Sequence, residues 1–396
     1  MASEKDSRLL KAMCGNVFVD VDHKKVRGIM YKRYCKIGVV FFVFFALGVN
    51  LVSAHACTGL RVMAQDKSAI FARTMEFATP LESDILFVPR NQSWKSQAPD
   101  GKDGLAWKND YAFIGPNALG DELVVEGMNE RGLYIGAFWF PNVAEYQKTT
   151  PADNPKTVAP TLFAALILGK CATVQEVKES LQHIKVAAVE FKKLGEVPPL
   201  HWYAMDSTGK AIVIEPVNGE IVVMDNPVGV FTNAPHFGWH LQNLANYVNL
   251  RPTNATAEKL GELHVSQIGQ GSGMLGIPGD FTPPSRFVRA ALLSNTAKPV
   301  KTADEAVNLA LTLISNITIS KGTVIEDVKD GQNALNYTQW VTVYDLTQKK
   351  LYFRTYGNQH IRMVTPKELP LDGKKKLLIP MCNVKPEYQD VTNQAK

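Results

Sequence analysis

An uncharged apolar segment that ends at a cysteine is the feature that most constrains this chain. Residues 37–54 (IGVVFFVFFALGVNLVSA) carry no charge, follow a cluster of three basic residues, and run into the pattern Ala54-His55-Ala56. A basic stretch, an apolar stretch and an A-x-A site, in that order, are typical of a secretory signal peptide. We therefore expect an exported chain, periplasmic or secreted, cleaved between Ala56 and Cys57.

Cleavage at this point gives Cys57 unusual chemistry. An N-terminal cysteine carries a thiol and a free α-amino group on one residue. The ordinary pKa of that amine is about 7.7–8.0, so part of it is neutral near neutral pH and accepts a proton. A nucleophile that brings its own base is the arrangement of the N-terminal-nucleophile (Ntn) hydrolases. Cys57 is thus a candidate nucleophile.

Three other interpretations of the junction stay open. The apolar run is 18 residues long, enough for one membrane span if it is not cleaved. Cys57 is also a candidate for lipidation, although Ala54 stands where lipoprotein signals usually have Leu. Finally, a single cysteine is most often a buried structural residue.

The basic residues are concentrated before the cleavage site. The chain holds 43 Lys+Arg and 38 Asp+Glu, of which nine and four lie in residues 1–36. The mature part is therefore neutral, which argues against a nucleic-acid partner and against stable membrane association after cleavage. We predict an N-terminal extension and signal peptide over 1–56, with an ordinary signal length if translation starts at Met30. The remaining 340 residues, 57–396, are expected to form a single domain.

The order of elements predicts the fold class. Strands are expected at 58–63, 68–72 and 86–89, and a hairpin at 123–126 and 132–140. Helices are expected at 161–169 and 173–183, the second with a capping box formed by Thr173 and Glu176. A four-strand meander is expected over 201–232, helices at 239–250, 284–294 and 303–315, and a last hairpin at 338–345 and 350–356. Without regular βαβ alternation, this order indicates an α+β fold with antiparallel sheets.

Short motifs along the chain resemble one enzyme family. They are Cys57-Thr58-Gly59, Ala72-Arg73-Thr74-Met75-Glu76, Phe87-Val88-Pro89-Arg90-Asn91, Gly127-Met128-Asn129-Glu130-Arg131-Gly132-Leu133, Phe231-Thr232-Asn233-Ala234-Pro235, Ser285-Arg286-Phe287-Val288-Arg289 and Gln339-Trp340. In order and spacing they resemble the choloylglycine hydrolases and penicillin V acylases over residues 57–360. The resemblance implies a four-layer αββα Ntn-hydrolase sandwich, hydrolysis of an amide bond without a cofactor, and a homotetramer.

The resemblance also implies roles for residues near the N-terminus. Cys57 is the expected nucleophile, and its own α-amine the proton carrier. Arg73 is expected to hold the thiolate or the surroundings of the amine with its planar, always-charged guanidinium. Glu76 stands where the family commonly has Asp, and is expected to hydrogen-bond the terminal amine. Each polar residue also has an ordinary interpretation, as a strand-end arginine or a surface carboxylate.

Three later residues complete the expected site. Asn233 is expected to aim its amide N–H at the oxyanion of the tetrahedral intermediate, although a turn asparagine is the plain alternative. Arg286 is expected to pair with an acidic group near the site, or else to be a helix-surface charge. The resemblance places Trp139 where relatives have a substrate-facing Asn or Tyr, and in this the sequence resembles the Gram-negative acylases more than the gut bile-salt enzymes. A tryptophan there favours an apolar or aromatic acyl group.

No metal site or cofactor is predicted. His236 and His240 have zinc-like spacing, but Gly238 and Trp239 lie between them and no glutamate partner is present. The two other cysteines of the mature part, Cys171 and Cys382, could pair in an exported chain, but two distant cysteines are weak evidence of a disulfide.

The sequence thus predicts an exported amidohydrolase with an N-terminal cysteine. Its candidate substrates are small N-acyl compounds: penicillin V-like amides, conjugated bile acids or N-acyl homoserine lactones. The alternative is a non-catalytic binding protein of the same fold, either lipid-anchored or tethered to a membrane.

Overall fold

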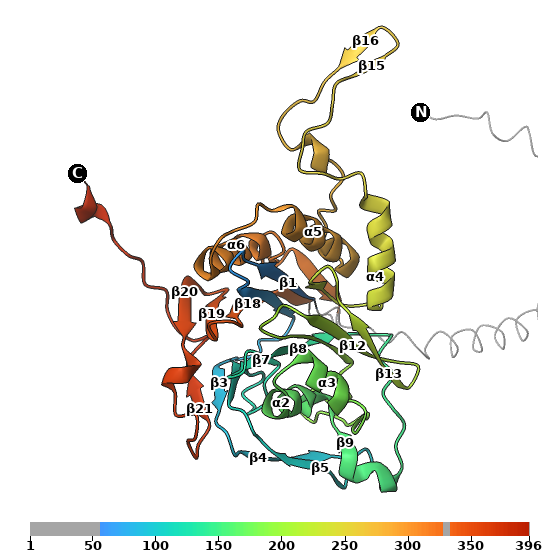
Figure 1. Cartoon of the computed structure of the whole chain (residues 1–396), viewed down its shortest axis with the longest axis vertical. Helices are drawn as coiled ribbons and strands as arrows, with labels where there is room; N and C mark the ends of the chain where they lie inside the picture. Colours follow the sequence, from blue (N-terminus) through green and yellow to red (C-terminus); the bar gives the residue numbers. More distant parts are fainter. Residues whose placement is uncertain (1–55, 328–332, 396) are drawn as a thin grey trace, which may run out of the picture. The chain divides into compact units, whose positions relative to one another are not determined.

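Two antiparallel β-sheets share an apolar core in the part of the chain that the structure describes (Figure 1). The structure is a computed structural model, and the residues it describes are 56–327 and 333–395. The expected signal peptide therefore lies outside the described residues, except for Ala56.

The first sheet carries the start of the expected mature chain. Its order is β14-β1-β2-β18-β19-β20, and β17 pairs with β18. The strands are β1 (Cys57–Met63), β2 (Ala69–Phe77), β14 (Val230–Phe231), β17 (Val324–Asp327), β18 (Asn333–Asp345), β19 (Lys350–Thr355) and β20 (Asn358–Val364).

The second sheet is built mainly from the middle of the chain. Its order is β13-β12-β11-β8-β7-β6-β3-β21. The strands are β3 (Ile85–Val88), β6 (Phe113–Pro116), β7 (Glu126–Asn129), β8 (Tyr134–Trp139), β11 (Leu200–Met205), β12 (Ala211–Val217), β13 (Glu220–Asp225) and β21 (Leu377–Ile379).

Helices cover the outer face of each sheet. Helices α5 (Pro283–Thr296) and α6 (Ala303–Ser315) pack on β1 and β2, whereas α2 (Pro160–Lys170) packs on β7 and β8 (Figure 1). Helix α3 (Val174–Ser180) follows α2 and joins the same outer core. The layers therefore run helix, sheet, sheet, helix, which confirms the expected αββα sandwich.

The interior between the sheets is aromatic. The ring of Phe71 on β2 stacks on that of Tyr203 on β11, with centroids 4.5 Å apart. Tyr134 on β8 meets Tyr344 on β18 at 4.9 Å. Because helices also cover the outer faces, every residue of β2 is buried, and its sequence lacks the apolar–polar alternation of a half-exposed strand.

The helices expected from local signals are confirmed, with shifts at their ends. Helix α6 has the expected bounds, because Thr302 accepts a hydrogen bond from the backbone N–H of Glu305 and caps its first turn. The capping box at α3 is also present, with Thr173 accepting from the N–H of Glu176. The helix expected at 239–250 is shorter: α4 covers Phe237–Asn243, and a 3₁₀ turn follows at Leu244–Tyr247.

Two expectations about strands are wrong. The meander keeps only three strands, since β14 leaves it and pairs with β1 of the other sheet, where Phe231 lies opposite Gly59. Gly229, with a φ of +71°, lies at the start of this change of sheet and adopts a conformation that other residues rarely take. The first strand of the middle hairpin begins at Glu126, three residues later than expected, because Val124 forms only an isolated β-bridge with Asn117 and lies outside the strand.

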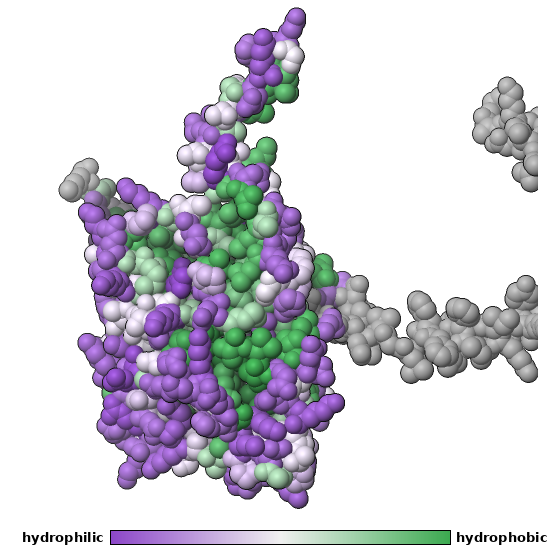
Figure 2. All heavy atoms as spheres, turned by 45° about the vertical axis from the view of Figure 1, so that its right-hand side comes forward, coloured by the Kyte–Doolittle hydropathy of each residue, from purple (hydrophilic) through white to green (hydrophobic). Residues whose placement is uncertain are grey.

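Smaller elements lie outside the two sheets. They are the hairpins β4 (Ser93–Gln97) with β5 (Asp103–Lys108) and β15 (Glu258–Leu260) with β16 (Leu263–Val265), and the parallel pair β9 (Thr157–Val158) with β10 (Lys185–Val186). The β15–β16 hairpin projects away from the sheets (Figure 1) and mixes hydrophilic and hydrophobic residues (Figure 2). Among the described residues, no helix has the length and apolar character needed to cross a membrane.

Candidate active site

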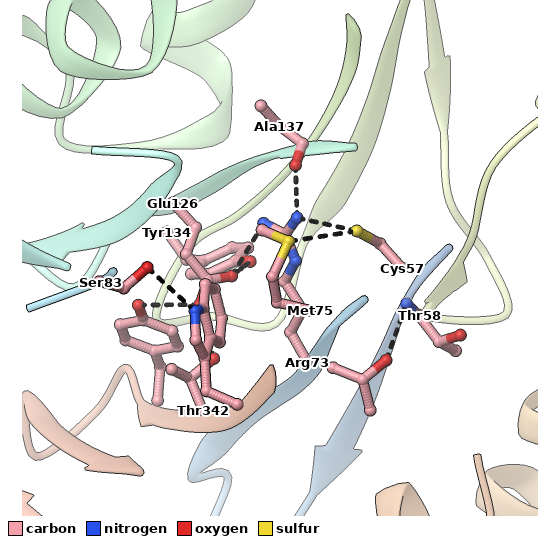
Figure 3. Close-up of polar contacts among 12 residues, drawn as sticks. Cys57, Thr58, Arg73, Met75, Ser83, Glu126, Tyr134, Ala137 and Thr342 are labelled. Carbon is pink, nitrogen blue, oxygen red and sulfur yellow. Dashed lines mark hydrogen bonds and ion pairs between the residues drawn. The ribbon is translucent and has the colours of Figure 1, made fainter. Parts of the chain in front are cut away.

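Cys57 is the first residue of β1 and lies opposite Met75 of β2. It is only 3% exposed. Its Sγ lies 3.3 Å from Nη2 of Arg73 and 3.7 Å from Sδ of Met75 (Figure 3). Burial raises the pKa of the Cys57 thiol, and the Arg73 guanidinium acts in the opposite direction. The thiol therefore depends on neighbouring groups for its deprotonation.

The backbone nitrogen of Cys57 is held by Asn233. Its N–H donates to Oδ1 of Asn233 at 2.9 Å. That Oδ1 also accepts from Nη2 of Arg286 at 2.8 Å, and Nδ2 of Asn233 donates to the carbonyl oxygen of Trp139 at 2.9 Å. Because arginine only donates, these partners fix the orientation of the Asn233 amide. In a chain cleaved before Cys57, this nitrogen would be the α-amine.

Arg286 lies on α5 and fixes the backbone around Cys57. Nη1 donates to the carbonyl oxygen of Cys57 at 2.6 Å and to Oγ1 of Thr58 at 2.5 Å. Burial lowers the pKa of Arg286 to about 10, and the charge of Glu76 opposes that effect. The expected acidic neighbour of Arg286 is therefore Glu76, but the hydrogen bonds of the guanidinium go to backbone and side-chain oxygens of other residues.

Arg73 is fully buried and joins three elements. Nη1 is paired with Oε2 of Glu126 at 3.0 Å, and Nη2 donates to the carbonyl oxygen of Ala137 at 2.5 Å. The guanidinium also lies 4.1 Å from the ring centre of Phe138. Burial works against its charge, but Glu126 and Cys57 outweigh that effect and hold the Arg73 pKa above its ordinary value. Arg73 thus presents a permanent positive charge to the sulfur.

Gly136 on β8 leaves the space that this arrangement needs. A Cβ atom at this position would lie 2.9 Å from Nη1 of Arg73 and 2.4 Å from the hydroxyl oxygen of Tyr134. Both contacts are shorter than normal van der Waals distances. Any larger residue would therefore force the Tyr134 hydroxyl or the Arg73 guanidinium to shift.

Glu126 is a site residue that the sequence interpretation missed. Besides Arg73, its carboxylate accepts hydrogen bonds from the hydroxyls of Tyr134 at 2.6 Å and Thr342 at 2.6 Å (Figure 3). It also accepts one from the hydroxyl of Tyr344 at 3.2 Å. The available signal was one acidic residue in the otherwise uncharged stretch 123–128. Its partners come from β2, β8 and β18, so local sequence did not reveal them.

The carboxylate of Glu76 lies at the end of β2 and differs from the expected placement. It accepts from the hydroxyls of Thr74 at 2.9 Å and Thr338 at 2.5 Å. Burial raises the pKa of Glu76 to about 7, against the charge of Arg286 and these hydroxyl donors. The expected bond to the Cys57 nitrogen is not formed, because a peptide nitrogen has one hydrogen and Asn233 accepts it. The role of Glu76 toward a free amine stays a prediction.

The two histidines with zinc-like spacing have separate structural positions. His236 precedes α4 and accepts from the N–H of Trp239. Nε2 of His240 lies 2.9 Å from the carbonyl oxygen of Asn233. Burial lowers the pKa of His240 to about 4, and the contact with Asn233 opposes it. A neutral His240 that donates from Nε2 supports the backbone of Asn233.

An apolar pocket opens beside Cys57. Its empty volume, counted out to its mouth, is about 770 Å³. It is lined by Cys57, Arg73, Met75, Phe77, Leu81, Ala118, Leu119, Leu123, Val124, Val125, Ala137, Trp139, Pro160, Thr161, Ala164, Phe191, Leu194, Pro198 and Leu200. Trp139 is therefore in the pocket wall, where the sequence placed it. Cys171 and Cys382 lie elsewhere and are free thiols.

Comparisons with known proteins agree with this geometry. A family model described as linear amide C–N hydrolases, choloylglycine hydrolase family, matches residues 57–378. The chain is 32% identical to the bile salt hydrolase/transferase of Clostridium perfringens, covering 81% of this chain and 95% of the relative.

Solved structures show the same fold. A variant of the conjugated bile acid hydrolase of C. perfringens matches with a TM-score of 0.75 and 28% identity, covering 85% of this chain and 100% of that one. Penicillin V acylase from Agrobacterium tumefaciens matches with a TM-score of 0.66 and 20% identity, covering 83% of this chain and 94% of that one. The described part of the chain therefore has the fold of the Ntn hydrolases.

The particular family follows from the match over residues 57–378 together with the close relatives. The chain belongs to the choloylglycine hydrolase family of linear amide C–N hydrolases. It is a hydrolase that acts on linear amide C–N bonds.

Proposed function

We propose that this protein is an N-terminal-cysteine amidohydrolase that is activated by cleavage between Ala56 and Cys57. The observation that carries the proposal is the position of both reactive atoms of Cys57. Its nitrogen lies 2.9 Å from Oδ1 of Asn233, and its sulfur lies 3.3 Å from Nη2 of Arg73 beside an apolar pocket. Cleavage turns that nitrogen into an amine without moving its partners.

The reaction then uses one residue as nucleophile and base. The α-amine accepts the thiol proton, and the sulfur of Cys57 attacks the amide carbonyl carbon. Asn233 and a backbone N–H stabilise the negative oxygen that develops. The C–N bond breaks as the α-ammonium gives its proton to the leaving amine. Water, deprotonated by the same amine, hydrolyses the thioester and releases the acid.

The lining of the pocket favours an acyl group that carries no hydroxyl groups. Its polar side-chain atoms come from Cys57, Arg73, Trp139 and Thr161, and Arg73 is already engaged by Glu126. A buried hydroxyl without a partner costs about 1–3 kcal/mol. We therefore favour an unsubstituted hydrocarbon or phenoxyacetyl group, as in N-acyl homoserine lactones or penicillin V, over the hydroxylated steroid of a conjugated bile acid.

Export and assembly complete the proposal. The signal-like segment supports secretion or a periplasmic location, and the family resemblance supports a homotetramer. Intact mass of protein recovered outside the cytoplasm tests the first point, and light scattering after gel filtration tests the second.

One experiment tests the activity itself. Protein with a verified mature N-terminus is incubated with penicillin V, N-dodecanoyl homoserine lactone and glycocholate, and the released amine is quantified. We expect a free N-terminal cysteine and fastest release from one of the first two compounds. A diacylglyceryl-modified Cys57, or a free Cys57 with no turnover of any amide, would contradict the proposal.

A further inference from the structure

Two separate chain segments line the acyl pocket. The first, residues 117–125, contributes Ala118, Leu119, Leu123, Val124 and Val125. The second is the turn 191–196, which contributes Phe191 and Leu194. An acyl group in the pocket contacts both, so their separation controls how well it is enclosed.

The turn 191–196 is closed on itself. Phe191 and Glu196 form an isolated β-bridge, and the N–H groups of Leu194 and Gly195 both donate to the carbonyl oxygen of Phe191. These bonds shape the turn but do not attach it to its surroundings.

The segment 117–125 is held by backbone hydrogen bonds to residues that precede β3. The N–H of Asn117 donates to the carbonyl oxygen of Asp84 at 2.9 Å, and that of Leu119 donates to Leu81 at 2.5 Å. Leu119 has a φ of +58°, an uncommon conformation for a leucine. Of the two segments, 117–125 is therefore the one held in place by its backbone hydrogen bonds.

Lys193 connects the turn to the fixed segment. Its Nζ donates to the carbonyl oxygen of Leu119 at 2.8 Å and pairs with Oδ2 of Asp121 at 3.3 Å. Within 56–327 and 333–395, every hydrogen bond or ion pair that leaves the turn 191–196 comes from this one ammonium group. The neighbouring Lys192 is exposed and makes no such contact in that part of the chain.

We propose that Lys193 is a positioning residue that holds the Phe191–Leu194 wall against the Leu119 wall and so determines which acyl groups the pocket accepts. The inference rests on the proposed amide hydrolysis. An acyl chain that reaches both walls gains apolar contact only while the walls stay together. A short acyl group that stays near Cys57 does not depend on them.

The test compares acyl lengths with one leaving amine. N-acetyl-, N-hexanoyl- and N-dodecanoylglycine are hydrolysed by the wild type, Lys193→Met, Lys193→Arg and the matched control Lys192→Met, with released glycine measured. Because the link is half exposed, we expect Lys193→Met to raise KM for the dodecanoyl compound about two- to fivefold. KM for the acetyl compound and kcat for both should stay within twofold.

Two further variants and a measurement at high salt serve as controls. Lys193→Arg keeps the charge and should restore wild-type KM, and Lys192→Met should have no effect. In the wild type, 1 M NaCl should raise KM for the dodecanoyl compound as Lys193→Met does, but should add little to that variant, because salt screens exposed pairs. An equal effect of Lys193→Met on all three compounds, or no effect on any, would overturn the proposal.

A binding measurement separates this inference from the proposed activity. Calorimetry of sodium dodecanoate with Cys57→Ser and with the double variant Cys57→Ser/Lys193→Met needs no turnover. Two- to fivefold weaker binding by the double variant supports the role of Lys193 even if glycine amides are not hydrolysed. Equal binding by the two proteins, or none, contradicts it.

Discussion

Oδ1 of Asn233 accepts a hydrogen bond from the nitrogen of Cys57 while also accepting one from Arg286. The acceptor is thus held in place by a buried cation that itself binds the carbonyl oxygen of Cys57. This closed set of contacts fixes the nitrogen and the carbonyl of the same residue. It turns the first peptide unit of β1 into a rigid support for the sulfur.

The free amine can be removed without changing any side chain. One Met that is retained before Cys57 converts the amine into a peptide nitrogen, which is no longer basic. We expect turnover to disappear while the melting temperature stays unchanged, since the uncleaved chain already satisfies Asn233. Intact mass must confirm the extra residue. Normal turnover by the extended chain would show that another group acts as base.

The sulfur is tested by Cys57→Ser. A serine hydroxyl has a far higher pKa than a thiol, and an amine of modest basicity activates it poorly. We expect a folded protein that hydrolyses its best amide substrate at less than about 1% of the wild-type rate. Circular dichroism and released amine are measured on one preparation. A rate within a few-fold of wild type would remove Cys57 from the mechanism.

The buried pair of Arg73 and Glu126 is tested by stability. Glu126→Gln keeps the shape of the side chain but leaves the Arg73 cation without its charge partner at 0% exposure. Loss of one member of a buried ion pair costs about 3–5 kcal/mol. The matched control is Asp372→Asn at the exposed pair with Arg90, which should cost less than about 1 kcal/mol. Urea unfolding of both variants gives the comparison, and equal small losses would contradict the assignment.

The features that the sequence predicted are those that have a local signal. Thr173 and Glu176 lie three residues apart, so the capping box at the start of α3 could be predicted from the sequence. The motifs around Arg73 and Asn233 located residues that the structure brings together at Cys57. In contrast, β14 pairs with β1, 170 residues earlier at Leu60 and Val230, and no local pattern reports such a partner.

The missed residues have the same explanation. The Glu126 carboxylate accepts hydrogen bonds from four side chains on three other strands, β2, β8 and β18, which are far apart in the sequence. Lys193 matters because a turn packs beside Leu119, 74 positions earlier in the chain. A single carboxylate or a pair of lysines in the sequence is typical of a solvated surface, and only the packed structure shows the contacts of Glu126 and Lys193.

The raised pKa of Glu76 predicts a pH-dependent stability of the chain that retains Ala56. Its pKa is about 7 when folded, against an ordinary 4.5. The folded state therefore binds a proton more tightly, and stability is full below about pH 4.5 and falls as pH rises toward 7. The loss is on the order of 3 kcal/mol.

Chemical denaturation at several pH values checks this prediction. Glu76→Gln should be less sensitive than wild type to pH between about 4.5 and 7, whereas Glu190→Gln, at an exposed position, should behave as wild type. The comparison between variants cancels the contribution of other titrating groups. Parallel curves for wild type and Glu76→Gln would show that Glu76 has the same pKa in the folded and unfolded chain.

Asn233 is the residue where catalysis and structure are hardest to separate, because its amide contacts Cys57, Arg286 and Trp139 together. Nδ2 of Asn233 has two hydrogens. One is donated to the carbonyl oxygen of Trp139, and the other is available to hydrogen-bond a developing oxyanion. Loss of such a donor lowers kcat by about 10²–10³-fold. Since the interaction strengthens in the transition state, Asn233→Ala should lower kcat and change KM little.

Asn233→Asp separates the two functions of the amide. It keeps an acceptor for the Cys57 nitrogen and for Arg286, so its melting temperature should exceed that of Asn233→Ala. It loses the donor and places negative charge where negative charge must develop, so it should be at least as inactive as the alanine variant. Melting temperature and kcat are measured on the same preparations. A stable Asn233→Asp enzyme with near-normal kcat would show that Asn233 only holds the nucleophile in place, and that the oxyanion is stabilised by other donors.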